Sequence, residues 1–202
     1  ADARYGVGFC NVTVDTLDTV AISYAFKLIE IGYSDITFSP KNYYINRTLW
    51  LPKIKDPSKA YDNGGSTDHN ITKITGPAYL KTVNTNTFTV ISRVDPVDQN
   101  DAEDNMQFDA YVIENLNIRA NSNQILLSIN SSYMSIIRNC FFTEGAKQLD
   151  LQFCMKASVE NCHFRSCSGI SLDIGYGVGK WAFASNGNAS TQSNGTSVKN
   201  CR

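Results

Sequence analysis

The chain has 202 residues, which is enough for about one domain with a single core. Lys plus Arg number 18 against 19 for Asp plus Glu, and this balance argues against binding to nucleic acid or to an anionic membrane. The longest apolar stretch, residues 20–31, is interrupted by Lys27 and Glu30, which excludes a membrane-spanning helix. Asn (20), Ser (19) and Thr (15) are spread along the chain, a composition that favours strands and turns over a helical bundle.

The first predicted element is an amphipathic helix. Asp15 and Asp18 occupy the positions of an N-cap and of a first-turn acid. Apolar residues then recur at steps of three and four until Gly32, and we expect this stripe to face the core. The stripe consists of Leu17, Val20, Ala21, Tyr24, Leu28 and Ile31.

Short strands and loops follow the helix. Residues 35–45 read as two strands with a turn at Pro40, and Asn42 suits a left-handed turn position. Residues 53–70 have little apolar content and predict a surface excursion, before strands near residues 71–74 and 88–94. The acidic loop of residues 95–107 has oxygen ligands for Ca²⁺, but it lacks the EF-hand order, and such loops are more often simply hydrated.

From about residue 110 the chain repeats a short motif. The copies are Ile113-Glu-Asn-Leu-Asn-Ile118, Ile137-Arg-Asn-Cys-Phe-Phe142, Val159-Glu-Asn-Cys-His-Phe164 and Val198-Lys-Asn-Cys-Arg202. Alternating strands at residues 125–129, 149–153 and 170–174 lie between them. A repeat of just over twenty residues with two or more short strands fits a parallel β-solenoid, whereas the leucine-rich-repeat framework is absent.

Stacking of the copies predicts columns of equivalent residues about 4.8 Å apart. One interior column would contain Ile113, Ile137, Val159 and Val198, a second Leu116, Cys140, Cys162 and Cys201, and a third Ile118, Phe142 and Phe164. The asparagines Asn115, Asn139, Asn161 and Asn200 would satisfy buried turn groups through stacked amides. Glu114, Arg138, Glu160 and Lys199 alternate in sign at one outward position, which predicts a ladder of exposed ion pairs.

The beginning of the chain resembles the pectate-lyase-like right-handed β-helix superfamily. The similar segments are Ala3-Arg-Tyr-Gly-Val-Gly8, Asp15-Thr-Leu-Asp-Thr-Val-Ala-Ile22 and Ile36-Thr-Phe-Ser-Pro-Lys-Asn-Tyr-Tyr-Ile45, with Ser39 and Asn42 where the family has Pro and Gly. The Val-x-Asn-Cys-x-Phe repeats also look like the coils of this family. The resemblance implies an all-β, right-handed parallel β-helix with an N-terminal capping helix, and it leaves the function open because this fold hosts several activities.

We expect three regions and a longer parent protein. Residues 1–52 would form the cap, residues 53–107 the first coils with surface loops, and residues 108–202 the regular coils. The chain begins without an initiator Met or a leader, so either a leader has been removed or the chain is a piece of something longer. It ends inside a repeat copy, without a capping element, and we therefore expect it to be the N-terminal part of a longer β-helix.

Two outward carboxylates are the candidate catalytic residues. Asp150 and Asp173 are 23 residues apart in adjacent predicted strands, and glycoside hydrolysis uses such a pair. The alternative is two solvated positions on a polar face. The resemblance leads us to look for polygalacturonase-type motifs or for a calcium-lyase arginine motif. Neither is found in the sequence.

The candidate substrate-binding residues are aromatic. Tyr176, Trp181 and Phe183 lie in a polar insert at residues 175–197 and are suited to stack on sugar rings, or alternatively to anchor the loop. His163 is predicted on the surface, far in sequence from His69. Cys140, Cys162 and Cys201 read as small interior residues, with free thiols favoured over a Cys162–Cys167 bridge. No zinc-ligand pattern occurs, and no cofactor or metal is expected.

The leading functional hypothesis is a phage tailspike-like or tail-fibre-like receptor-binding protein. It would recognise, and possibly cleave, a bacterial surface polysaccharide as a homotrimer, in a virion tail with other tail proteins or in the extracellular space, without binding nucleic acid or inserting into a membrane. One alternative is a secreted polysaccharide lyase or glycoside hydrolase. Another is a non-catalytic structural shaft of a virion or adhesin.

Overall fold

The computed structural model describes residues 14–30, 35–52, 71–93, 110–175 and 195–202. Within these ranges the chain is mostly strand with one helix, and the expectation of an all-β protein is confirmed. The described part has no helix of the length and apolarity that crossing a bilayer requires. The elements are α1 (Leu17–Glu30), β1 (Asp35–Thr37), β2 (Asn42–Ile45), β3 (Leu49–Trp50), β4 (Ile71–Thr82), β5 (Thr89–Ser92), β6 (Ala110–Ala120), β7 (Ile125–Tyr133), β8 (Ile136–Arg138), β9 (Phe141–Glu144), β10 (Lys147–Met155), β11 (Ser158–Glu160), β12 (His163–Arg165), β13 (Ile170–Gly175) and β14 (Ser197–Lys199).

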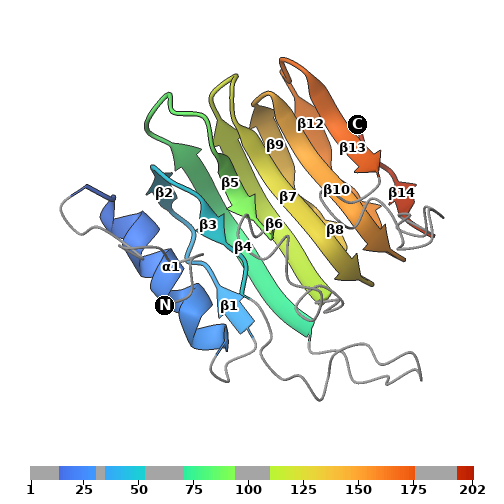
Figure 1. Cartoon of the computed structure of the whole chain (residues 1–202), viewed down its shortest axis with the longest axis horizontal. Helices are drawn as coiled ribbons and strands as arrows, with labels where there is room; N and C mark the ends of the chain where they lie inside the picture. The colour runs from blue at the N-terminus through green and yellow to red at the C-terminus, as the bar shows by residue number, and fades with distance from the viewer. Residues whose placement is uncertain (1–13, 31–34, 53–70, 94–109, 176–194) are drawn as a thin grey trace, which may run out of the picture.

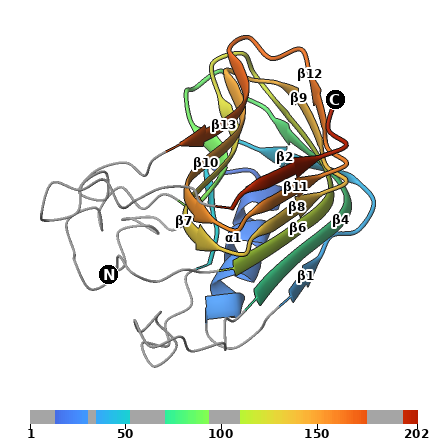
Figure 2. The same cartoon turned by 90° about the vertical axis from the view of Figure 1, so that its right-hand side faces the viewer.

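The strands form two sheets, and every described pair of neighbouring strands is parallel. A five-stranded sheet has the order β13-β10-β7-β5-β3, and a nine-stranded sheet contains β1, β2, β4, β6, β8, β9, β11, β12 and β14. After β3 the chain passes back and forth between the two sheets. Each of the strands β5, β7, β10 and β13 of the five-stranded sheet is preceded and followed in the chain by one or two strands of the nine-stranded sheet. Helix α1 lies at one end of the row of strands and β14 at the other (Figure 1), and the strands surround a common interior (Figure 2).

The first interior column is in the predicted register. Ile113 pairs with Ile137, Ile137 with Val159, and Val159 with Val198. The first three side chains are fully buried, whereas Val198 is 45% exposed because no further described strand covers it. Apolar burial therefore fixes the register, since a shift by one residue would turn each of these side chains outward.

The other two columns also lie where the repeats predict them. Cys140 and Cys162 are fully buried, and the hydrogen bond with Cys162 together with burial raises the pKa of the Cys140 thiol well above its ordinary value. The rings of Phe142 and Phe164 stack at 5.2 Å between centroids. All five described cysteines are free thiols, as expected for Cys162 and Cys167, but Cys201 at the end of its column is only half-buried.

The asparagine column has a different function from the one predicted. Asn115, Asn139, Asn161 and Asn200 all have positive φ, between 52° and 59°, and their side chains are exposed. Asn200 Nδ2 donates to Asn161 Oδ1 at 3.3 Å, so two of the amides do stack, but on the exposed side and not on buried turn groups. Asparagine tolerates the left-handed backbone conformation, and here it lets the chain turn between two short strands such as β8 and β9.

The predicted charge ladder is present, but its first member is buried. Arg138 pairs with Glu114 at 2.6 Å, and Lys199 lies 3.8 Å from Glu160. Glu114 is only 6% exposed and also pairs with Lys73 at 3.0 Å. Hydrogen bonds from Lys73 and Arg138 lower the pKa of the Glu114 carboxyl below 4.5. This carboxylate therefore stabilises the fold above pH 4.5, and its contribution is lost as the pH falls through the lowered value.

The helix faces the core with a different side from the predicted one. The buried residues of α1 are Thr19, Ile22, Ser23, Phe26 and Ile29, whereas Leu17 is 84%, Tyr24 54% and Leu28 48% exposed. Both sides of the helix carry apolar residues at helical spacing, so periodicity alone selects neither. The side of the helix that faces the core is the one with Phe26, a large side chain that is fully buried.

Two local predictions at this end of the chain are wrong. Thr16 caps the helix in place of Asp15, because its Oγ1 accepts a hydrogen bond from the Thr19 N–H at 3.2 Å. Asp15 pairs instead with Arg47 at 2.9 Å. Asn42 begins β2 and does not occupy a left-handed turn position. The predicted excursion at residues 53–70 and the acidic loop at residues 95–107 lie outside the described residues, and the three-region division stays a prediction.

The first interior column provides a matched test of the stacking. Val159→Ala is expected to lower the free energy of unfolding by about 2 kcal/mol, because it removes buried methyl groups and leaves a cavity. Val198→Ala makes the same change at a position that is 45% exposed, and about half that loss is expected. Urea denaturation measures both. Equal losses at the two positions would contradict the stacked arrangement.

Candidate functional site

The predicted acid pair comes together on the outward side of the five-stranded sheet. Asp150 in β10 is directly in register with Asp173 in β13, so their Cα atoms are about one strand spacing apart. The Lys147 ammonium lies between the two carboxylates, 3.0 Å from Asp150 Oδ1 and 2.7 Å from Asp173 Oδ2. A single cation therefore neutralises the pair in part.

Asp150 is held more firmly than Asp173. Besides Lys147, it accepts hydrogen bonds from Ser128 Oγ at 3.0 Å and from Gln152 Nε2 at 2.8 Å, and it is 8% exposed. The side chain of Asp173 is 33% exposed, and Lys147 is the partner that the structure gives it within the described residues. Asp173 is thus the carboxylate with acceptor capacity left for a ligand.

The environment of Lys147 keeps its ammonium group charged. Burial acts to lower the pKa of the ammonium, but the hydrogen bonds to Asp173 and Asp150 outweigh it and raise the pKa above 10.5. General acid catalysis of glycoside cleavage requires one protonated carboxyl group. With Lys147 in place, both carboxylates have a cation partner, an arrangement suited to accepting hydrogen bonds from hydroxyl groups. The proposed catalytic role of the pair stays a prediction.

The acid pair belongs to a longer file of outward residues. Trp50, Ser92, Ser128, Asp150 and Asp173 are in register with one another, one from each strand of the five-stranded sheet. Four strand spacings separate Trp50 from Asp173, a span of about 19 Å. The file therefore places an aromatic residue at one end and two carboxylates at the other.

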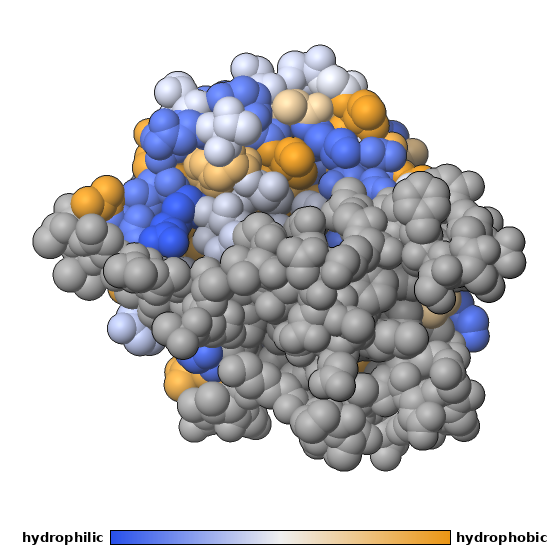
Figure 3. Space-filling view, in the orientation of Figure 1, coloured by the Kyte–Doolittle hydropathy of each residue, from blue (hydrophilic) through white to orange (hydrophobic). Residues whose placement is uncertain are grey.

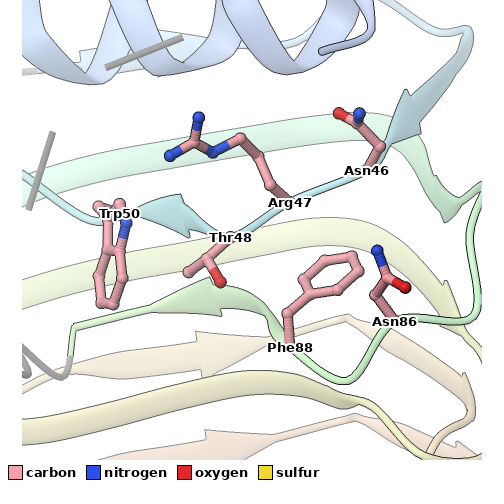
Figure 4. A pocket seen from close by; sticks show the side chains of 6 residues that line it. All are labelled: Asn46, Arg47, Thr48, Trp50, Asn86 and Phe88. Carbon is pink, nitrogen blue, oxygen red and sulfur yellow. The ribbon is translucent and has the colours of Figure 1, made fainter. Parts of the chain in front are cut away.

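A pocket adjoins the aromatic end of this file. It has a volume of about 280 Å³ and is lined by Asn46, Arg47, Thr48, Trp50, Asn86 and Phe88. Figure 4 shows Trp50 and Phe88 on either side of Thr48, with Arg47 and Asn46 nearer the helix. The Asn46 amide is already used, since Oδ1 accepts from Thr16 N and Nδ2 donates to Val14 O. Two aromatic rings beside hydroxyl and amide groups form a lining that suits a small polar ring.

A buried polar atom lies beside the acid pair on the same sheet. Asn130 is in register with Gln152. Among the residues that the structure describes, Asn130 Oδ1 is buried without a hydrogen-bond partner. Such an atom is costly unless a further polar group satisfies it. Burial raises the pKa of Cys154 to about 12, so its thiol is not a nucleophile at neutral pH.

Other predicted site residues cannot be placed in this arrangement. Tyr176, Trp181 and Phe183 lie outside the described residues, as does the whole candidate calcium loop. Within the described ranges no group of three or more His, Cys, Asp or Glu side chains is arranged to hold a metal ion.

Sequence analysis missed Lys147 and Trp50 for physical reasons. Residues three apart on a regular strand point to opposite sides of the sheet, so Lys147 and Asp150 were not expected to meet. Between them Gln148 is fully buried and its amide donates to three carbonyls, those of Phe142, Glu144 and Arg165, which interrupts the alternation. Trp50 is in a two-residue strand without a repeat motif. Ser128 was missed as well, because alignment of the predicted strands at residues 125–129 and 149–153 places Leu126 opposite Asp150, whereas the structure pairs Ser128 with Asp150.

Comparisons with protein-family models, with curated proteins and with solved structures give no match. The site is therefore interpreted from its own geometry.

The role of Lys147 can be tested by removal of its charge. Lys147→Met is expected to lower the free energy of unfolding by about 2 kcal/mol at neutral pH, because two partly buried carboxylates then face each other without a cation. Urea denaturation as a function of pH measures the difference from the wild-type protein. The difference should shrink above pH 10.5, as the wild-type ammonium loses its proton at its raised pKa.

Two control variants accompany this test. Lys147→Arg retains the positive charge and should unfold close to the wild type. Asp173→Asn in the Lys147→Met background removes the repulsion and should recover most of the lost stability. A loss in Lys147→Met that does not depend on pH would show that the alkyl chain matters and the charge does not.

Proposed function

We propose that the chain is part of a right-handed parallel β-helix that binds a bacterial surface polysaccharide, in the manner of a phage tailspike. The β-helix is supported by the parallel pairing in both sheets, by the alternation of the chain between them, and by columns of equivalent residues. This architecture places outward side chains at intervals of about 4.8 Å, close to the length of one sugar residue in an extended chain.

The file from Trp50 to Asp173 carries the proposal. Its aromatic end provides an apolar surface of the kind on which pyranose rings stack, and its carboxylate end accepts hydrogen bonds from sugar hydroxyls. Ser128 and Gln152 hold Asp150 in place, so little side-chain order is lost on binding. The part of the surface coloured in Figure 3 is polar with separate apolar patches, a character that suits a polar ligand.

Binding to purified capsular and lipopolysaccharide glycans tests this function. Trp50→Ala is expected to weaken binding at least tenfold, since it removes the ring at the aromatic end of the file. Tyr24→Ala is the control, because it removes an aromatic residue that is 54% exposed on the helix. Calorimetry or biolayer interferometry measures the affinity. If a glycan binds equally well to wild type and Trp50→Ala, the file is not its site.

Cleavage of the polysaccharide is the second candidate function, and the direct register of Asp150 with Asp173 favours it. A lyase or hydrolase secreted as a monomer would release unsaturated uronate or reducing ends, whereas a tailspike would be a homotrimer attached to other tail proteins. Asp150→Asn and Asp173→Asn should each abolish cleavage if the pair is catalytic. Light scattering after size-exclusion chromatography is expected to give three times the chain mass. A monomer that cleaves would favour the secreted enzyme, and a trimer that neither binds nor cleaves would favour a structural shaft.

A further inference from the structure

A second outward surface, on the nine-stranded sheet, differs in character from the Trp50–Asp173 file. Its first row runs through Asn42, Tyr79, Asn117, Phe141 and His163, which are in register across β2, β4, β6, β9 and β12. Tyr79 is 49% and Phe141 40% exposed. Exposed aromatic residues in one row form a surface that a ligand can contact.

The second row on this surface carries positive charge. Tyr44, Lys81, Arg119, Thr143 and Arg165 are in register across the same strands, next to the first row. Arg119 pairs with Glu144 at 2.6 Å. Within the described residues, Lys81 and Arg165 have no acidic partner, and three strand spacings, about 14 Å, separate them.

The end of the first row adds another cation. Phe141 and His163 stack with 4.3 Å between ring centroids, and Arg202 Nε donates to His163 Nε2 at 2.9 Å. The two rows and Arg202 together carry four cationic side chains, against the carboxylate of Glu144 and that of Asp18, which accepts a hydrogen bond from the Tyr44 N–H at 2.9 Å. The whole chain has a net charge of −1, so the positive charge is concentrated on this surface.

Asn117 creates a gap within the aromatic row. Its side chain is half-buried and shorter than its neighbours Tyr79 and Phe141, which are about 9.6 Å apart as two strand spacings. A sugar ring in this gap has an aromatic residue on each side and the Asn117 amide beneath it. An amide donates to and accepts from hydroxyl groups, and aromatic carbons contact the apolar faces of the sugar.

We propose that this second surface binds an acidic polysaccharide, with one sugar between Tyr79 and Phe141 and its acidic groups at Lys81 and Arg165. The proposal rests on the proposed glycan-binding function and adds to it the charge of the ligand and a second contact surface. Charge complementarity selects an acidic chain, and the gap with its amide selects a sugar over a polymer that lacks hydroxylated rings. A nucleic acid, whose charges are more closely spaced, matches two unpaired cations 14 Å apart less well.

Binding of polygalacturonate, dextran and a single-stranded oligonucleotide to the whole chain tests this inference. We expect polygalacturonate to bind more tightly than dextran, and its affinity to fall as salt concentration rises. The double variant Lys81→Gln/Arg165→Gln should weaken binding at least tenfold and flatten the salt dependence. Lys199→Gln is the matched control, because it removes a charge that is 65% exposed and lies outside the two rows.

A gap-filling variant tests the sugar position separately from the charge. Asn117→Phe extends the row of stacked rings, so it should preserve the thermal transition of the fold while it weakens polygalacturonate binding at least tenfold. Phe141→Ala opens the gap and should also weaken binding. Unchanged affinity in Asn117→Phe would overturn the proposed sugar position.

The outcomes distinguish this inference from the proposed function. If polygalacturonate binding is lost in Trp50→Ala but unchanged in the Lys81/Arg165 double variant, the second surface is wrong and glycan binding at the first file stands. Tighter binding of dextran or of the oligonucleotide than of polygalacturonate would also overturn the acidic glycan. If neither these polysaccharides nor purified bacterial glycans bind, both proposals fail.

Discussion

The in-register stacking of parallel strands is the constraint on which the rest of the structure depends. Ile113, Ile137 and Val159 are fully buried because each lies directly over its equivalent in the next strand. A shift by one residue would expose all three and bury the charged neighbours Glu114 and Arg138 in their place. The apolar column thus fixes not only the interior but also which outward residues lie side by side.

The two outward surfaces follow from the same constraint but meet different physical demands. On the five-stranded sheet, Asp150 and Ser128 are less than a tenth exposed, and their hydrogen bonds hold the polar groups in fixed positions. On the nine-stranded sheet, Tyr79 and Phe141 are exposed and supply apolar area next to cations. The first surface is suited to recognition by directed hydrogen bonds, and the second to recognition by ring contact and charge.

The sequence predicts those features that repeat, because a repeat places equivalent residues in register whatever their detailed conformation. This holds for the Ile113 column, for Cys140 above Cys162, and for Asp150 beside Asp173. Prediction from the sequence fails where the same pattern of residues is compatible with two structures. Helix α1 has apolar residues on both sides, and the packing of Phe26 decides which side is buried. The prediction gave the asparagine side chains a role in hydrogen bonding. The left-handed backbone conformation, as at Asn139, explains instead why asparagine occurs at these positions.

The acid pair shows why register alone does not define a chemical role. Two carboxylates one strand spacing apart, without a cation, repel each other, and such repulsion favours protonation of one of them. The buried amide of Gln148 interrupts the alternation of β10 and brings Lys147 to the same side of the sheet as Asp150. The resulting ammonium forms an ion pair with each carboxylate, 3.0 Å from Asp150 and 2.7 Å from Asp173. A local irregularity in one strand therefore turns a pair that resembles a glycosidase site into a cluster better suited to hold a polar ligand.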